Sequence, residues 1–544
     1  MKRIILFISI VTALFIVSCD DDFGDMNRDP KKPTETNYGL QFVGVSSKLP
    51  SVGMQQMALR NELLYAYTGL AARTRAVIPI DGVVDRTRGE VWNNYYKFLS
   101  NARRLTYDIE NYEGELVTTN ALAMIKILVS YCTLRTTDVY GDIPYSEAGR
   151  SFLPSDAAIF RPTYDDQESI YTHCLEELKW ASENLNTNPG DDWMSFNSFD
   201  AFYKGDLVKW QKLANSLLLR YAMRISEKDM ESAKSYIGYV MSGNKPLIES
   251  IEDDFVLIRT SSDMESNRSN IFNAARSCGL RLGEPVWELV SSDIGDETGA
   301  SIIDPRAKIF FEPDTANVWR AGEVTFNFQS MSPVDYGDDV YSDGRRKEYN
   351  YVDENNGPAR DNYYAAFNFD MVNGYNVRTP FLTSSEIYFL KAEIYARSEF
   401  GISGDVKSSY EEGVRQSCKY WMDVVANDFP NELGTGEDAW KGAPAPTGSD
   451  EDLQMIENLL LAHPYNGLHD IYTQKWFSLF WQPEEAFYMM VRTGEPRALT
   501  TGSDLYRISY SLDEPVNNLE NYNSQLQKMG GTDSPSMKNW WMPN

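Results

Sequence analysis

Apolar residues recur at helical spacing along much of the chain. The clearest example is LVKWQKLANSLLLRYAMRIS, residues 207–226, where apolar side chains from Trp210 to Ile225 repeat at i, i+3, i+4 and i+7. This period places them on one face of an amphipathic helix. Arg220 and Arg224 fall beside that face, and we expect them to cap helix ends or pair with acids between helices rather than form a binding patch.

The helices predicted in this way come in pairs, which indicates a mostly α-helical fold. Repeated helical hairpins are typical of tetratricopeptide-like stacking, although no strict 34-residue period is present. Gly141 and Pro144, in the loop DVYGDIPYSEA, favour a tight turn over a ligand loop. The predicted pairs are 120–136 with 166–185, 206–226 with 229–242, and 384–397 with 405–426.

Long segments without helical periodicity separate these pairs. The largest covers residues 250–383, and within it residues 312–378 are rich in Asp, Asn, Gly and aromatic residues. A second segment, 427–452, has the composition of a linker. Long loops inside a compact protein usually carry function. We therefore expect the long irregular segment to carry function.

The first residues have a different pattern. Two positive residues precede the apolar run 4–17, which is too short to span a bilayer as a helix and is typical of a secretory signal. The run ends in IVSC, which resembles the lipobox of bacterial lipoproteins, and Cys19 is followed by three aspartates that resemble an export signal. An alternative is a free cysteine after an ordinary signal peptide or membrane anchor.

This pattern predicts that the chain is divided into three parts. Residues 1–18 form a lipoprotein signal peptide, 19–40 an acidic tether, and 41–544 a single domain, although the length also allows two domains. We expect Cys19 to carry acyl chains such as palmitate, which anchor the protein on the extracellular face of the outer membrane.

The composition of the chain excludes some classes of function and favours others. The net charge is −28, and removal of residues 1–18 makes it −30, so a nucleic-acid partner is not expected. After the lipobox the chain has no C-x-x-C, which argues against a zinc knuckle or a disulfide scaffold, while disulfide pairing itself stays open. The remaining cysteines are Cys132, Cys174, Cys278 and Cys418. Aromatic residues make up 13% of the chain, and those outside helical periods suit stacking on sugar rings.

No catalytic or metal motif stands out. With 79 acidic residues, carboxylate pairs such as Glu484 and Glu485 arise by chance, and G-x-S-x-G and P-loop motifs are absent. The run DYGDDVYSDGRR, 335–346, has residue types of a calcium loop, but Tyr341 stands where an oxygen ligand is needed. We expect no enzyme activity, no metal site and no cofactor. A glycosidase or peptidase is the alternative.

Several segments, taken in order, resemble the SusD/RagB family of nutrient-binding outer-membrane lipoproteins, in its starch-binding-associated subgroup. The segments are MNRDPKKPT after the lipobox, TTDVYGDIPYSEA, KWQKLANSLLLRYAMRIS, LTSSEIYFLKAEIYA, IYTQKWFSLFWQPEEAFYMMVRTGEPRAL, RISYSLDEPVNNLENY and the closing NWWMPN. One departure is Phe487, where the family motif often has tryptophan, and we interpret it as a tolerated change of core packing.

The resemblance implies a helical scaffold with a loop-rich ligand-binding region. It also implies a SusC-like TonB-dependent transporter as partner, to which the protein delivers a bound nutrient. The nutrient is expected to be an oligosaccharide, with a peptide as the alternative. A third hypothesis is a structural adaptor of the transporter that binds no ligand.

Two regions have the composition that the resemblance implies for a binding site, residues 73–92 and 317–341. The segment VWNNYYKFLSNARRL also reads as the start of a core helix, so Trp92 has packing as its alternative, whereas Trp319 stands in no apolar period and is expected to be exposed. The predicted stacking residues are Trp92, Trp319, Tyr336 and Tyr341, and the predicted hydrogen-bond donors are Arg75, Arg86 and Arg320.

Overall fold

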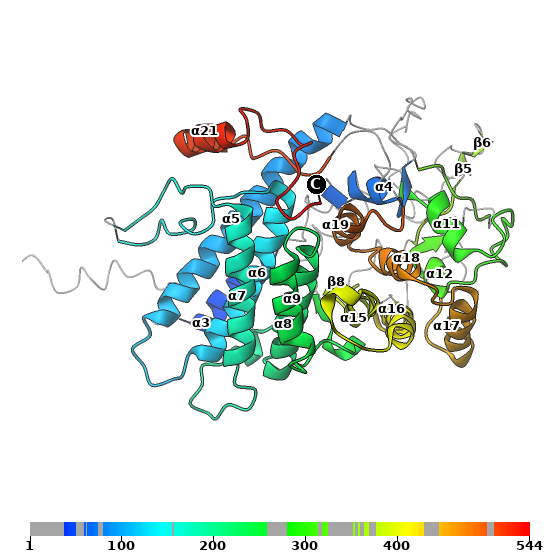
Figure 1. Cartoon of the computed structure of the whole chain (residues 1–544), viewed down its shortest axis with the longest axis horizontal. Coiled ribbons are helices and arrows are strands. Elements are labelled where there is room, and N and C mark those ends of the chain that lie inside the picture. Colours follow the sequence, from blue (N-terminus) through cyan, green and yellow to red (C-terminus); the bar gives the residue numbers. More distant parts are fainter. Residues whose placement is uncertain are drawn as a thin grey trace, which may run out of the picture.

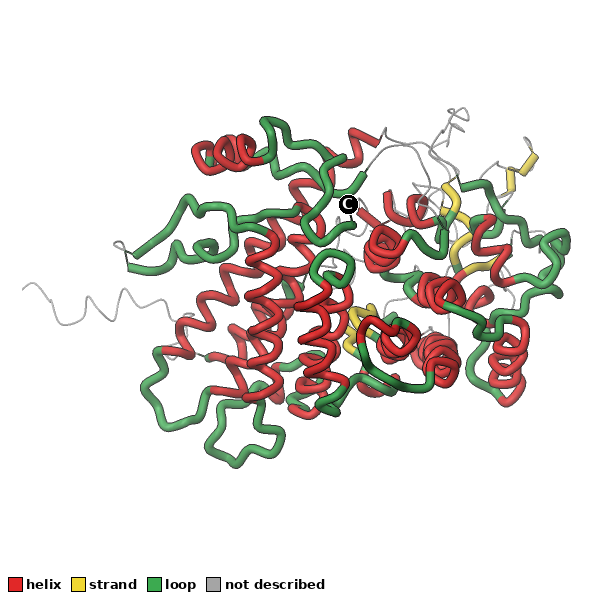
Figure 2. The backbone as a smooth tube through the Cα atoms, in the orientation of Figure 1, coloured by secondary structure: helices red, strands yellow, loops and turns green. Residues whose placement is uncertain are grey.

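The structure is a computed structural model. It describes residues 37–49, 59–60, 63–73, 80–154, 157–257, 280–313, 318–324, 352–353, 357–358, 364–368, 371, 377–428, 445–497 and 505–543. The fold is mostly helical, as predicted, and strands are few and short in the described part (Figure 2). The predicted signal peptide, Cys19 and most of the tether lie outside these residues.

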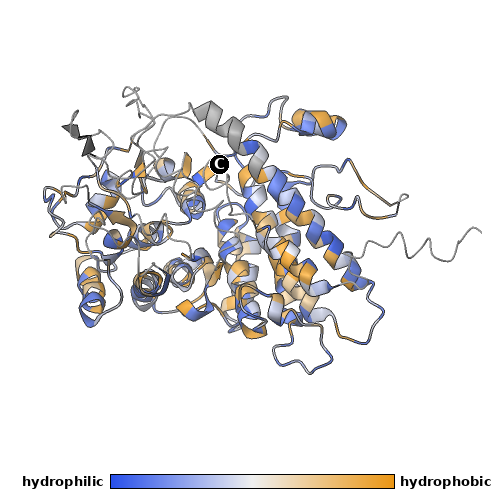
Figure 3. Ribbon diagram, turned by 180° about the vertical axis from the view of Figure 1, so that it is seen from behind, coloured by the Kyte–Doolittle hydropathy of each residue, from blue (hydrophilic) through white to orange (hydrophobic). Residues whose placement is uncertain are grey.

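Long helices lie side by side in one half of the molecule, at the left of Figure 1. Figure 3 shows this bundle from behind, with hydrophobic residues concentrated where its helices face one another. The helices of this half are α3 (Tyr38–Ser46), α5 (Ile80–Glu110), α6 (Thr119–Tyr140), α7 (Gln167–Asn184), α8 (Leu207–Arg224) and α9 (Met230–Met241).

The other half combines one long helix, α16, and several short helices with small sheets. Its main helices are α11 (Glu284–Val290), α12 (Pro305–Phe310), α15 (Ser384–Ala396), α16 (Val406–Asp428), α17 (Asp450–Ala462), α18 (Leu468–Ser478) and α19 (Pro483–Thr493). Short helices α4 (Tyr65–Thr68), α20 (Glu514–Asn517) and α21 (Leu519–Lys528) complete the fold.

The three predicted helical hairpins are confirmed. Helix α6 packs against α7, α8 against α9, and α15 against α16. Polar caps fix where the helices begin: Asp206 accepts hydrogen bonds from the backbone N–H groups of Val208 and Lys209 in α8, and Asp229 accepts one from Ser232 in α9. Such caps satisfy N–H groups that have no partner inside the helix.

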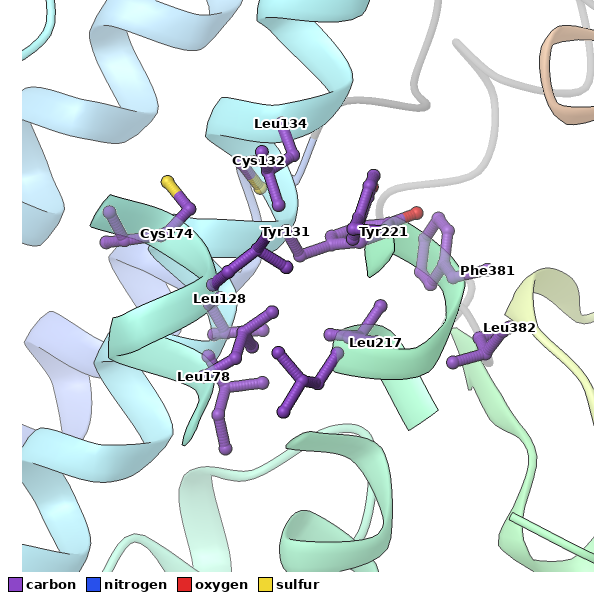
Figure 4. Packing of buried hydrophobic residues seen from close by; sticks show 14 of the residues in the cluster. Leu128, Tyr131, Cys132, Leu134, Cys174, Leu178, Leu217, Tyr221, Phe381 and Leu382 are labelled. Carbon is purple, nitrogen blue, oxygen red and sulfur yellow. The ribbon is translucent and has the colours of Figure 1, made fainter. Parts of the chain in front are cut away.

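Side chains from α6, α7 and α8 meet in the core of the bundle (Figure 4). Leu128, Leu178 and Leu217 face one another there, and Phe381 of strand β8 (Thr379–Leu382) closes one side. Cys132, Cys174 and Cys418 are buried free thiols, and burial raises the pKa of each. Cys278 lies outside the described residues.

Buried ion pairs join the two halves. The Arg220 guanidinium of α8 donates to Glu386 of α15, with Nε 2.9 Å from Oε1. Arg224 pairs with Asp138 of α6 at 2.5 Å and also with Glu485 of α19. The prediction that these two arginines pair with acids is therefore confirmed.

Glu484, beside Glu485 on α19, is also buried and pairs with Arg60 and Arg135. Burial alone would raise the pKa of Glu485, but the surrounding cations, Arg220 first, lower it to about 2. The two carboxylates thus serve the ion-pair network. Phe487 is buried on the same helix, where its ring meets Tyr67 edge to face.

The larger sheet of the second half has the strand order β1-β3-β7-β4, and its strands pair antiparallel. Its core is aromatic: Phe310 stacks on Phe480 with ring centroids 4.5 Å apart, and Phe367 packs against both Phe311 and Phe480. The strands are β1 (Ala72–Arg73), β3 (Leu280–Arg281), β7 (Ala366–Phe367) and β4 (Phe311–Glu312). Two further sheets pair β2 (Phe255–Leu257) with β8, and β5 (Val352–Asp353) with β6 (Gly357–Pro358).

Among the helices that the structure describes, none combines the length and the apolar character needed to cross a bilayer.

Candidate functional site

The two predicted ligand regions begin side by side in space. Strand β1 ends at the start of region 73–92, and Gly322 lies within region 317–341. Gly322 forms a parallel bridge with Gly283, and a Cβ added to it would lie 3.0 Å from the Cβ of Ala72. The absence of a side chain at Gly322 thus allows the two regions to approach closely. The structure therefore brings together the bases of segments that are far apart in the sequence.

Trp319, three residues before Gly322, is buried rather than on the surface. Its side chain is 3% exposed, and its ring is parallel to that of Trp287 of α11, with centroids 6.2 Å apart. The loop after α11 covers the indole: Gly299, at φ 78°, comes so close that an added Cβ would lie 2.5 Å from the indole Nε1. The expectation of an exposed ring was wrong, because a loop rather than a periodic helix buries it.

The covering loop is held by its own hydrogen bonds. Asp296 accepts from the backbone N–H and hydroxyl of Thr298, at 2.9 and 2.6 Å, and from the Ser301 backbone N–H at 2.7 Å. These bonds lower the pKa of Asp296 because they stabilise the carboxylate. The backbone N–H of Trp319 donates to the carbonyl of Glu297 at 2.7 Å. The loop and the tryptophan segment are thus fixed to each other.

Arg320, next to Trp319 in the sequence, pairs with the same covering loop at its outer rim. Its guanidinium donates to both carboxylate oxygens of Glu297, at 2.8 and 3.0 Å. Arg320 therefore remains near the predicted site, but a ligand would have to compete with Glu297 for its Nε and Nη2 groups. Solvent-exposed ion pairs contribute little to stability, so displacement of Glu297 by a ligand would cost little free energy.

Trp92 is also 3% exposed and lies inside α5, in the core of the bundle. Its ring contacts those of Tyr96, Tyr140 and Tyr510 at centroid distances of 4.9, 5.1 and 5.7 Å. The alternative interpretation, that this segment belongs to a core helix, is confirmed. The interpretation of Trp92 as a stacking surface for a ligand was wrong, because helical packing covers the ring.

The other predicted site residues stay predictions. Arg86 lies in the first part of α5, where only the backbone is described. Arg75, Tyr336 and Tyr341 lie outside the described residues, and so does the acidic run 335–346. No cluster of three or more potential metal ligands occurs in the described part of the chain.

The helical half also contains a cavity that the sequence did not reveal. It measures about 390 Å³ and is lined by α5, α6, α7 and the loop between α6 and α7. Among its lining residues are Arg103 of α5 and, from the loop, Tyr145, Arg150 and Phe152. The loop sequence YSEAGRSF, 145–152, could have indicated this cavity, because aromatic residues and an arginine stand there among polar residues.

Comparison with solved structures shows the same fold. A chitin-binding protein matches with a TM-score of 0.70 and 22% identity, over 93% of this chain and 100% of its own. A SusD homologue from Parabacteroides distasonis matches with a TM-score of 0.69 and 20% identity, over 94% and 98%. A chitin-binding SusD homologue from Flavobacterium johnsoniae matches with a TM-score of 0.62 and 20% identity, over 93% and 98%.

A search of curated proteins found no match to the sequence. The model of the SusD-like family, described as starch-binding and associating with the outer membrane, matches residues 82–505. This match covers most of the helical half and the small sheet region. The chain therefore belongs to the SusD-like family of starch-binding proteins that associate with the outer membrane.

Proposed function

We propose that the protein binds an oligosaccharide at the cell surface and delivers it to a TonB-dependent transporter of the outer membrane. The observation that supports this proposal is that Ala72, directly before region 73–92, lies against Gly322 of region 317–341 in a chain of the SusD-like family. Both regions contain arginines, and region 317–341 contains tyrosines; planar donors and aromatic rings are the residue types that suit sugar rings.

Within this site, Tyr336 and Tyr341 are the proposed stacking residues, and Arg75 and Arg86 are the proposed donors. Trp319 has a supporting role, since its burial fixes residues 318–324, which precede the two tyrosines in the sequence. Arg320 joins the donors where a ligand hydroxyl or carboxylate displaces Glu297.

Calorimetry with a panel of neutral oligosaccharides and peptides tests the ligand class. We expect binding of a glucose- or N-acetylglucosamine-based oligosaccharide and no binding of peptides. Combined replacement of Tyr336 and Tyr341 by alanine should weaken binding at least about ten-fold, since a stacking ring contributes about 1–3 kcal/mol in nucleic-acid sites. Tyr236→Ala, on the distant helix α9, is the matched control and should bind as the parent does.

Three other outcomes contradict the proposal. Peptide binding alone would favour the peptide hypothesis, and release of product by catalytic amounts of protein would favour an enzyme. Association with the transporter without binding of any panel member would favour a structural adaptor. Co-purification of a TonB-dependent barrel from native membranes tests the partner.

The proposal includes anchoring through Cys19, with 1–18 as signal peptide, 19–40 as tether and 41–544 as one domain. Cys19→Ala protein should lose its partition into detergent and its protease accessibility on whole cells. Retention of both properties would contradict lipid anchoring on the extracellular face.

A further inference from the structure

The cavity between α5, α6 and α7 has the features of a second binding site. It adjoins a further cavity of about 340 Å³, and the two share the lining residues Arg103, Tyr145, Arg150 and His173. Their sizes fall in the range of small-ligand pockets, roughly 300–1,000 Å³. The site lies in the helical bundle, away from the small sheet where the proposed oligosaccharide site begins.

The loop that covers these cavities is fixed by its own sequence. At Gly149, with φ 77°, the backbone passes so close to α5 that an added Cβ would lie 3.2 Å from the Cα of Ser100. Asp165 accepts hydrogen bonds from the backbone N–H groups of Tyr145 and Ser146, at 2.8 and 2.9 Å. The loop therefore places Arg150 beside α5 without a ligand, and a preformed site loses less entropy on binding.

The cations of the site are the first indication of its ligand. Arg103 donates from Nη2 to the Tyr145 carbonyl at 3.3 Å, while its Nε is buried without an acceptor. Neither Arg103 nor Arg150 forms an ion pair with any carboxylate in the part of the chain that the structure describes. Three acids also line the two cavities, Glu110, Asp165 and Glu177, but Glu177 pairs with Lys126 and Asp165 accepts from the loop backbone. Because Arg103 and Arg150 pair with none of them, their guanidinium groups favour an anionic ligand.

Aromatic rings supply the second indication. Tyr107 of α5 is 39% exposed, and its ring meets that of Phe152 edge to face at 5.6 Å. Both line the larger cavity together with Arg103 and Arg150. Tyr145 lies beneath the Arg103 guanidinium, 5.0 Å from ring centroid to Cζ. A ligand that fits both features has an apolar ring face and a carboxylate at its edge.

We propose that this cleft binds an acidic saccharide, with the carboxylate of a uronic acid unit on Arg103 and Arg150 and the sugar ring against Tyr107 and Phe152. A uronate combines the required carboxylate with a C–H-bearing ring face, which an inorganic anion does not. This site is separate from the proposed oligosaccharide site and would let the protein retain acidic glycans as well as neutral ones.

Titration calorimetry with trigalacturonate and neutral galactotriose tests the proposal on the full mature protein. We expect trigalacturonate to bind at least ten-fold more tightly than galactotriose, with an affinity that falls as salt rises. Arg150→Ala should reduce trigalacturonate affinity at least ten-fold and leave the melting temperature unchanged, because Arg150 is exposed. Arg161→Ala, an exposed arginine of the same loop that does not line the cleft, is the matched control.

Tyr107→Ala separates a saccharide from a simple anion, since loss of the ring should weaken trigalacturonate binding but not acetate binding. Equal affinity of the Arg150→Ala and parent proteins, equal binding of the two trisaccharides, or binding of acetate or an acidic tripeptide as tight as that of trigalacturonate would overturn the proposal. Replacement of Tyr336 and Tyr341 should leave trigalacturonate binding intact, so failure of one site is distinguishable from failure of the other.

Discussion

Two buried tryptophans show how the two halves of the molecule differ. Trp210 is fixed by the apolar period of α8, and its Nε1 donates to Asp200 at 2.8 Å. Trp319 belongs to no period, and a loop carrying Gly299 covers it. Both rings are buried, but only the first is recognisable from local spacing. Burial in the loop-rich half is thus produced by contacts between segments, and an irregular sequence there does not indicate exposure.

Charged groups differ in the same way. Arg224, at the junction of the halves, is buried with Asp138 and Glu485, whereas Arg320 pairs with the half-exposed Glu297 at the rim of the loop-rich half. Buried charges need their partners, while exposed pairs are screened by water. The junction pairs therefore support the fold, whereas the rim pair contributes little to its stability.

The largest expected effect comes from breaking the junction. Arg224→Ala leaves Asp138 and Glu485 buried near each other without their shared cation, and should lower the free energy of unfolding by about 3–5 kcal/mol. Urea unfolding followed by circular dichroism measures this. Arg415→Ala, which removes a solvent-exposed pair with Glu457, is the control and should change it by less than about 1 kcal/mol. Equal effects would mean that the junction pairs do not join the halves.

Trp319→Ala tests whether the loop-rich half has a core of its own. Loss of a buried indole that stacks on Trp287 should lower the free energy of unfolding by about 3 kcal/mol or more, as large-to-small core changes do. Thermal unfolding of this variant and of Trp210→Ala allows a direct comparison of the two halves. An unchanged melting temperature for Trp319→Ala would show that its ring contributes no packing.

Acid should weaken a buried ion pair inside the loop-rich half, between Glu393 of α15 and Arg492 of α19, in a defined pH window. Burial alone would raise the pKa of Glu393, but Arg492 and other cations lower it to about 2 from an ordinary 4.5. Its stabilising effect is present above pH 4.5 and is lost as the pH falls toward 2. Between pH 5 and pH 3, the parent should therefore lose about 2 kcal/mol more stability than Glu393→Gln. Parallel pH dependences in urea unfolding would contradict this prediction.

The smallest expected effect is at the rim. Glu297→Gln removes the charge that pairs with Arg320 and should change the free energy of unfolding by less than about 1 kcal/mol. Calorimetry of the same variant should show equal or tighter oligosaccharide binding, because Arg320 exchanges partners more easily. A large loss of stability would place this pair with the junction pairs.

Local sequence determined the helical hairpins of both halves to a large extent. The hairpins at 120–185, 206–242 and 384–426 follow from apolar periods, and caps such as Asp206 fix where helices begin. These features were predictable because helical periodicity and capping depend on residues within a few positions of one another. For Arg220 and Arg224 the sequence left helix capping and pairing with acids open, and the structure shows that both are buried and pair with acids, as the cost of burying an isolated charge requires.

Tertiary structure alone decided which residues meet across the loop-rich half and the bundle. The approach of Gly322 to Ala72, the cover over Trp319 and the cleft around Arg103 and Arg150 each join segments that are distant in sequence. No local pattern encodes such contacts, since they depend on the shape of the backbone and the space that glycines leave for a second chain segment. The sequence thus indicated the residue types of a candidate site, and packing determined that Trp92 and Trp319 are buried rather than at the surface.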